Sequence, residues 1–153
     1  MNEERYKKLK ASAQRYTAYR ERAPKEVADK LKEWSAPEAV ISRILEDLRK
    51  DKFIDEERFS RAYCHDKFLI NKWGKNRLRM ELSKYQISES AKNAGLAYIN
   101  DEVYAETLKH LANSKWDKLK DPDLFKKKQK TARYLLQKGF ESELVWDVIN
   151  DLS

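Results

Sequence analysis

The chain has 153 residues, of which 39% are charged, and it carries a net charge of +7 at neutral pH. Its mean hydropathy of -0.93 predicts a thin hydrophobic core. It contains only 3 glycines and 3 prolines. Because sandwiches and barrels need many turns, this composition argues against an all-β fold and favours a helical protein.

The single cysteine, Cys64, excludes an internal disulfide and is typical of a protein of the reducing cytosol. The N-terminus is charged and lacks the apolar core of a signal peptide, and no run approaches the roughly 18 apolar residues of a membrane span. We therefore expect a cytoplasmic protein that does not contact a membrane. The positive charge lies mainly in the first two thirds of the chain, and it favours a polyanionic partner or an acidic protein surface.

Three helices are expected in the first third, and two prolines mark their boundaries. The first helix fills residues 1–22. Pro24 and Pro37 each suit the first turn of a helix, because proline has no amide proton to leave unpaired there. Apolar residues at a spacing of three or four mark the buried faces: Leu9, Ala13, Tyr16, Tyr19, Val27, Leu31, Trp34, Val40, Ile41, Ile44, Leu45 and Leu48.

Residues 53–87 predict two amphipathic helices joined at Trp73 and Gly74. Asp55 can cap the first helix, and the acidic residues after it suit the positive end of the helix dipole. Gly74 is interpreted as the break between the two helices. The expected buried face comprises Phe59, Ala62, Tyr63, Phe68, Leu69, Leu78 and Leu82.

The last third is predicted to begin with a helix capped by Asn100, followed by a longer connection. Asp121 and Pro122 are interpreted as the cap and the first residue of the helix after that connection. Most of the remaining aromatic side chains are expected to hold helix to helix in the core. They are Tyr16, Tyr19, Trp34, Phe53, Tyr63, Trp116, Phe140 and Trp146.

The same arrangement of helices returns along the chain. Leu31, Leu82 and Leu135 each end a second helix and are separated by 51 and 53 residues. The following helices then align: Val40 with Ala91 and Leu144, Ile44 with Gly95 and Val148, Leu45 with Leu96 and Ile149, and Leu48 with Ile99 and Leu152. We predict an all-α fold of three tandem three-helix repeats, similar to helix-turn-helix modules, that stack into an elongated curved array. The expected divisions are a helical extension over residues 1–15 and repeats over residues 16–54, 55–99 and 100–153.

Catalytic chemistry finds little support in the sequence. His65 and His110 are the only histidines. Cys64 precedes the first of them, but neighbours on a helix point about 100 degrees apart and do not simply form a nucleophile and a base. We expect a part-buried thiol beside a surface imidazole. No metal-ligand spacing, phosphate-binding glycine loop or nucleophile elbow is present, so no enzyme activity, metal or cofactor is expected.

A basic window lies between residues 67 and 84. Its cations are Lys67, Lys72, Lys75, Arg77, Arg79 and Lys84, against the single acid Glu81. Such side chains can contact phosphates or carboxylates, and an exposed aromatic beside them can stack on a nucleic-acid base. A chain this charged also produces such windows as solvated helix faces, so both interpretations stay open. Trp73, inside the window, is interpreted as a core residue in preference to a stacking one.

A second basic segment comprises Lys126, Lys127, Lys128 and Lys130. Three aspartates lie just before it, so a solvated helix face is the favoured interpretation. The alternative is that this segment extends the basic surface along the array.

Several motifs together resemble the RecX family of bacterial regulators of RecA recombinase. The central segment combines an acidic cap with Arg58-Phe59, Arg61-Ala62-Tyr63, Trp73-Gly74, Arg77-Leu78 and Glu81-Leu82. Residues 135–140, with the sequence LLQKGF, are similar to that family's last repeat. The similarity extends from about Tyr16 to Leu152. The sequence departs from the family at residues 84–87, KYQI, where Lys-Gly-Ile is common.

The resemblance implies a protein that binds the RecA filament on single-stranded DNA, lies in its groove, and inhibits its extension, ATP hydrolysis and strand exchange. Weak direct binding to DNA is compatible with the basic window. Two alternatives stay open: a DNA-binding protein of repressor or nucleoid type that needs no RecA, and a helical scaffold that binds only proteins. Because an array with polar ends need not self-associate, we expect a monomer.

Overall fold

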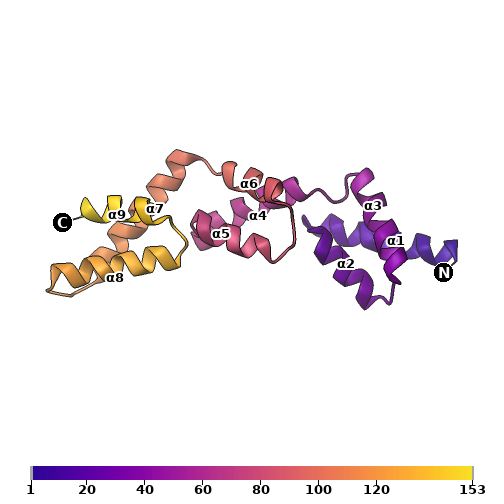
Figure 1. Ribbon diagram of the computed structural model, residues 1–153, viewed down its shortest axis with the longest axis horizontal. Coiled ribbons are helices and arrows are strands. Elements are labelled where there is room, and N and C mark those ends of the chain that lie inside the picture. Colours follow the sequence, from indigo (N-terminus) through magenta and orange to yellow (C-terminus); the bar gives the residue numbers. More distant parts are fainter. Residues whose placement is uncertain (1, 153) are drawn as a thin grey trace. The chain divides into compact units, whose positions relative to one another are not determined.

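The computed structural model describes residues 2–152, and all regular structure in that range is helical. This confirms the predicted all-α fold of tandem three-helix repeats (Figure 1). The chain divides into two compact units. The first extends to Tyr63 and includes Leu82–Gly95, and the second comprises Cys64–Glu81 and the chain from Leu96 onward. The division therefore runs through the second of the three predicted repeats.

The first unit begins with three helices that pack on one another (Figure 1). They are α1 (Glu3–Tyr19), α2 (Pro24–Glu33) and α3 (Glu38–Lys50). Pro24 is the first residue of α2 and Pro37 is the N-cap of α3, so both prolines stand at helix starts as the sequence predicted. The common core buries Tyr6, Leu9, Ala13, Val27, Leu31, Ile41, Ile44, Leu48 and Ile54.

The rest of the first unit contains the start of α4 (Glu56–Asn71) and most of α6 (Glu89–Ala97). These helices cross at Ser60 and Gly95, where a Cβ added to Gly95 would lie 2.7 Å from the Ser60 backbone. The crossing therefore requires glycine on α6. Beside it, the ring of Phe59 lies 5.9 Å from that of Tyr63 and 5.0 Å from that of Tyr85, between centroids.

The second unit contains the end of α4, most of α5 (Lys75–Ser83), and three further helices. These are α7 (Asp101–Lys118), α8 (Leu124–Gln137) and α9 (Ser142–Asn150), which pack on one another (Figure 1). The ring of Tyr104 lies 5.6 Å from that of Phe68 and 5.2 Å from that of Phe140. This row of buried rings joins α4, α7 and the turn before α9.

The repeats share a turn that the sequence did not reveal. The three aligned leucines are all fully buried. Four residues after each of them the backbone turns left-handed, with φ of 62° at Ser35, 57° at Gln86 and 100° at Gly139. In the first and third repeats the next amide donates back to the leucine carbonyl, at 3.0 and 3.2 Å, which is a Schellman-type helix end. One backbone geometry therefore ends the second helix of every repeat.

Two of the predicted helix caps are confirmed and one is wrong. Asp55 and Asn100 each accept a hydrogen bond from the amide three residues further on, both at 3.0 Å. Asp121 and Pro122 do not begin α8. That helix is capped by Asp123, which accepts from an amide of its first turn at 3.2 Å. Asp121 is instead engaged by a lysine side chain of α8.

Three residues expected in the core are exposed. Tyr19 is 87% exposed because it ends α1 beyond the packed part of that helix. Phe53 is 37% exposed, and its neighbour Ile54 is buried in its place. Leu69 is 48% exposed on α4, where Phe68 takes the inward position. Five aromatic residues expected in the core are only half-buried: Tyr16, Trp34, Tyr63, Trp116 and Trp146.

Candidate nucleic-acid interface

The predicted basic window lies at the junction of α4 and α5, and the turn between α8 and α9 packs directly against it. The amide of Gly74 donates to the carbonyl of Lys138 at 2.7 Å, and the amide of Asn76 donates to the carbonyl of Gly139 at 2.9 Å. A Cβ added to Gly74 would lie 2.3 Å from the Gly139 backbone, so this approach requires glycine. Gly74 lies in the break between α4 and α5, as the sequence predicted, and Lys72, with φ of 58°, makes the left-handed turn there.

The position of Gly139 also requires glycine, because Arg77 of α5 lies against it. Its φ is 100°, and an added Cβ would lie 2.3 Å from the Cβ of Arg77. The guanidinium of Arg77 donates to the carbonyl of Gln137 at 3.5 Å. The two glycines therefore let the backbones touch, and this contact holds Arg77 beside the α8–α9 turn.

Two cations lie near the ring of Trp73. The guanidinium carbon of Arg77 is 4.5 Å from the ring centroid, and the ammonium nitrogen of Lys67 is 5.7 Å from it. Both distances fall within the range of a cation–π interaction. Trp73 is half-buried, so it is neither the core residue that the sequence favoured nor a fully exposed one. Part of the indole remains accessible next to two positive charges.

Lys138 adds a further positive charge. Its ammonium donates to the carbonyl of Asn71 at 2.6 Å. Partial burial lowers the pKa of Lys138 below its ordinary value, and the positive charges of Arg77 and Lys72 lower it further. An anion bound here would relieve that repulsion. We call Lys67, Lys72, Arg77 and Lys138, together with Trp73, the basic cluster.

The remaining residues of the basic window are placed differently. The ammonium of Lys75 is 3.9 Å from the carboxylate of Asp101 and 5.1 Å from the ring centroid of Tyr104, so it is engaged with α7. Arg79 is exposed on α5. Lys84 is exposed in the turn after α5 and belongs to the first unit.

The lysines of the second basic segment lie on α8. Lys127 is 4.3 Å from the ring centroid of Trp116, and Lys130 donates to Asp121 at 2.9 Å. The hydrogen bond from Lys130 lowers the pKa of the Asp121 carboxyl. Lys126 is exposed and Lys128 is half-buried. Whether these residues or those of the basic cluster bind a partner stays a prediction.

Lys138 is the member of the basic cluster that the sequence did not reveal. It lies far along the chain from the basic window and reaches the cluster only through the contact between Gly74 and Gly139. A signal was present in those two glycines, since a chain with 3 glycines has few places for close backbone contact.

The cysteine and the histidine next to it in the chain lie in different environments. Cys64 is fully buried, which corrects the expectation of a part-buried thiol, whereas His65 is exposed with its Nδ1 3.4 Å from the Asp66 carboxylate. Across residues 2–152, no three His, Cys, Asp or Glu side chains are grouped so that they could hold a metal ion. Within the same range, no helix has the length and apolar character needed to cross a membrane.

The fold and the basic cluster define a helical-repeat protein built from tandem three-helix domains. Two family models match the chain: the second three-helix domain of RecX over residues 55–96, and the third three-helix domain of RecX over residues 102–149. Together these segments span more than half of the 153 residues. The chain belongs to the RecX family.

Relatives and solved structures agree with that assignment. Regulatory protein RecX of Clostridium acetobutylicum is 29% identical over 99% of this chain and 72% of its own length. Its counterpart in Clostridium perfringens strain 13 is 28% identical over 100% of this chain and 72% of its own. The crystal structure of RecX from Lactobacillus salivarius superposes with a TM-score of 0.88 and 25% identity, covering 96% of each chain. A second crystal structure, of regulatory protein RecX, gives a TM-score of 0.82 and 28% identity over 95% of this chain and 73% of the other.

Proposed function

We propose that this protein regulates RecA recombinase by binding the RecA filament on single-stranded DNA and inhibiting its extension, ATPase and strand exchange. Membership of the RecX family is the observation that carries this proposal. The protein acts by binding, in the cytoplasm, and needs no cofactor. Tandem repeats suit that role, because several weak contacts along an extended partner give avidity without a deep pocket.

The basic cluster supports contact with a nucleic-acid phosphate. Arg77 and Lys72 already lower the pKa of Lys138, so a phosphate at this point compensates a repulsion built into the fold. The accessible part of Trp73 offers a face for a base or a guanidinium plane. Together these groups provide the charge and the aromatic surface with which proteins commonly hold single-stranded DNA.

The test is binding to RecA filaments and to bare single-stranded DNA over a range of salt concentrations. The variant replaces three cations by glutamine: Lys67→Gln, Arg77→Gln and Lys138→Gln. Glutamine at 138 keeps a donor for the Asn71 carbonyl, so the turn retains its hydrogen bond. If each cation meets one phosphate, the slope of log affinity against log salt falls by about 2 for the variant.

The control removes the same charge elsewhere. Lys7→Gln, Lys50→Gln and Lys118→Gln are exposed positions outside the basic cluster. The control variant should bind like the wild type. Equal loss of binding in both variants would show that only net charge matters, and the cluster would have no special role.

An independent DNA-binding protein of repressor or nucleoid type is the second candidate, and the basic cluster is the observation that favours it. On that account bare DNA is bound as tightly as the RecA filament, and binding falls steeply with salt. On the RecA account the filament is bound more tightly than bare DNA at the same salt concentration.

A further inference from the structure

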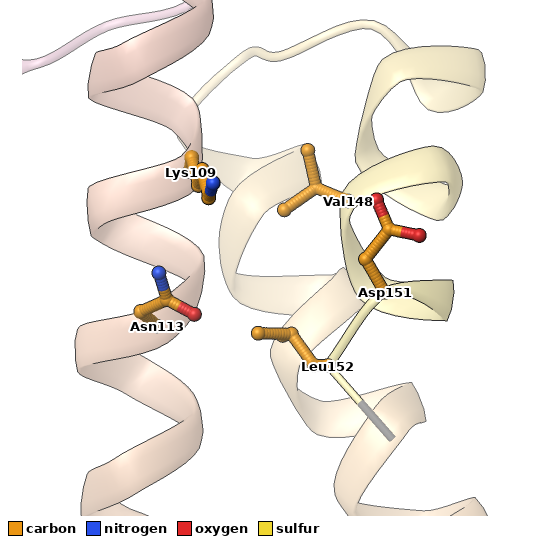
Figure 2. Close-up of a pocket in the computed structure, with 5 residues that line it drawn as sticks. All are labelled: Lys109, Asn113, Val148, Asp151 and Leu152. Carbon is orange, nitrogen blue, oxygen red and sulfur yellow. The ribbon is translucent and has the colours of Figure 1, made fainter.

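An open groove runs between α7 and α9 in the second unit. One part, of about 380 Å³, is lined by Tyr104, Leu108 and Leu144 among others. A second part, of about 210 Å³, continues it along the same two helices, and Val148 lines both. In Figure 2, Lys109 and Asn113 on α7 stand opposite Val148, Asp151 and Leu152.

The first repeat fills the corresponding space. There Ile44 and Leu48 are fully buried against α1 and α2 in the common core. Their counterparts in the third repeat, Val148 and Leu152, remain half-exposed. Leu144 beside them is 40% exposed. The third repeat therefore leaves apolar surface uncovered at a position that the first repeat closes.

The groove is acidic although the chain is basic overall. Four carboxylates line its two parts: Asp101, Glu141, Asp147 and Asp151. Asp101 is paired with Lys75, and Glu141 accepts a hydrogen bond from the hydroxyl of Tyr104.

Asp147 and Asp151 stand one turn apart on the α9 side, and neither forms an ion pair within residues 2–152. The C-terminal carbonyls of α9 add partial negative charge next to them. Lys109 on the opposite wall balances the charge of Asp151 in the smaller part of the groove. The larger part keeps a net negative charge, because three carboxylates line it against the single cation Lys75.

A segment of complementary character lies at the start of α8. Leu124 is 52% exposed and Phe125 is 69% exposed, so two large apolar side chains project next to each other. Lys126, which is exposed, and Lys128, which is half-buried, follow them. The segment is thus apolar and basic, where the groove is apolar and acidic.

We propose that the start of α8 in one copy docks into the α7–α9 groove of a second copy. Phe125 and Leu124 would cover Leu144 and Val148, and Lys126 and Lys128 would meet Asp147 and Asp151. The two surfaces are different patches of one chain, so the contact is heterologous and adds copies head to tail. Such an assembly suits a protein that works on a long polymer, and it differs from the expectation of a monomer.

Sedimentation velocity of the full chain, from about 10 µM to about 1 mM, measures this association, since a small interface gives affinities in that range. The wild type should gain mass as concentration rises. A groove variant, Asp147→Lys with Asp151→Lys, should remain monomeric, and so should a segment variant, Lys126→Glu with Lys128→Glu.

Mixing the two variants gives the sharper result. The groove variant keeps an intact segment and the segment variant keeps an intact groove, so one wild-type contact forms between them. The two mutated surfaces also attract each other, because lysines in one groove then meet glutamates in the other segment. The mixture should therefore associate although each variant alone stays monomeric, and this outcome also shows that both variants are folded. A control with the same charge change, Glu46→Lys with Glu143→Lys, alters exposed acids outside the groove and should associate like the wild type.

Three outcomes would overturn the proposal. The wild type could sediment as a monomer at every concentration. Association could be unaffected by either variant pair. The control could lose association as fully as the groove variant, which would assign the effect to net charge alone.

Discussion

The contact between the two glycine turns of the second unit gives the sharpest prediction for stability. Gly74→Ala should destabilise that unit, because the new Cβ would lie 2.3 Å from backbone atoms of Gly139 and Phe140. Backbone atoms cannot rotate away as a side chain can, so the α4–α5 and α8–α9 turns must separate. Separation breaks the two hydrogen bonds that the amides of Gly74 and Asn76 donate.

The cost follows from these losses. Two hydrogen bonds contribute about 1 kcal/mol each, and overpacking of a close contact costs about 2 kcal/mol. Alanine lowers the conformational entropy of the unfolded chain, which stabilises the folded state by about 0.5–1 kcal/mol. This gain applies because Gly74 does not have a positive φ, so alanine can adopt its backbone conformation. The net loss is about 3 kcal/mol, which corresponds to a roughly 100-fold change in an opening equilibrium.

Hydrogen exchange of individual amides measures this directly. Amides of α8 should exchange about 100-fold faster in Gly74→Ala, while those of α3 in the first unit keep their protection. Gly95→Ala is the matched control, because its Cβ meets the Ser60 backbone and should speed exchange in the first unit only. Unchanged exchange in α8 would refute the argument that the backbone contact holds the second unit together.

Three further predictions concern single side chains. Burial and the hydrogen bond to Asp47 raise the pKa of Tyr6 to about 12, so its contribution to stability is complete below pH about 10 and is lost as pH rises through about 12. The urea midpoint should fall in that window for the wild type, and a fall of equal size in Tyr6→Phe would contradict the assignment. Ser60→Ala should leave the thermal midpoint unchanged or raise it, since the buried Ser60 hydroxyl has no hydrogen-bond partner among residues 2–152; a lower midpoint would show that it has one. Tyr104→Phe should cost about 2–3 kcal/mol in urea unfolding, because the hydroxyl donates to Glu141 and accepts from an α5 amide. A cost below about 0.5 kcal/mol would mean that these bonds contribute little.

The periodic part of the fold was predictable from the sequence. Leu31, Leu82 and Leu135 recur at nearly equal separations, and all three are fully buried. Helix starts at Asp55 and Asn100 followed from local chemistry, since a capping side chain acts on an amide only three residues away. Such features depend on neighbours in the sequence, which the sequence itself displays.

Features that depend on tertiary contacts were missed. Ser35 and Gln86 adopt the same left-handed turn as Gly139, although nothing in their side chains requires it. Three aspartates precede α8, and the sequence alone did not distinguish the cap Asp123 from Asp121.

Some residues of the basic cluster were predicted from the sequence, and others were found only in the structure. Lys67, Lys72 and Arg77 were identified because they are close in sequence, and the structure gathers them around Trp73 or beside Lys138. Lys138 comes from a distant turn and was found only in three dimensions. Lys75 has the right charge and spacing, but its ammonium is turned toward Asp101 on α7.

The central claim is that this protein acts on the RecA filament. The most direct measurement is the ATPase rate of RecA on single-stranded DNA, with this protein added at few copies per filament and at physiological salt. A falling rate, without comparable affinity for bare DNA, is the result that the account predicts. An unchanged rate together with tight binding to bare DNA would contradict it and would favour an independent DNA-binding protein.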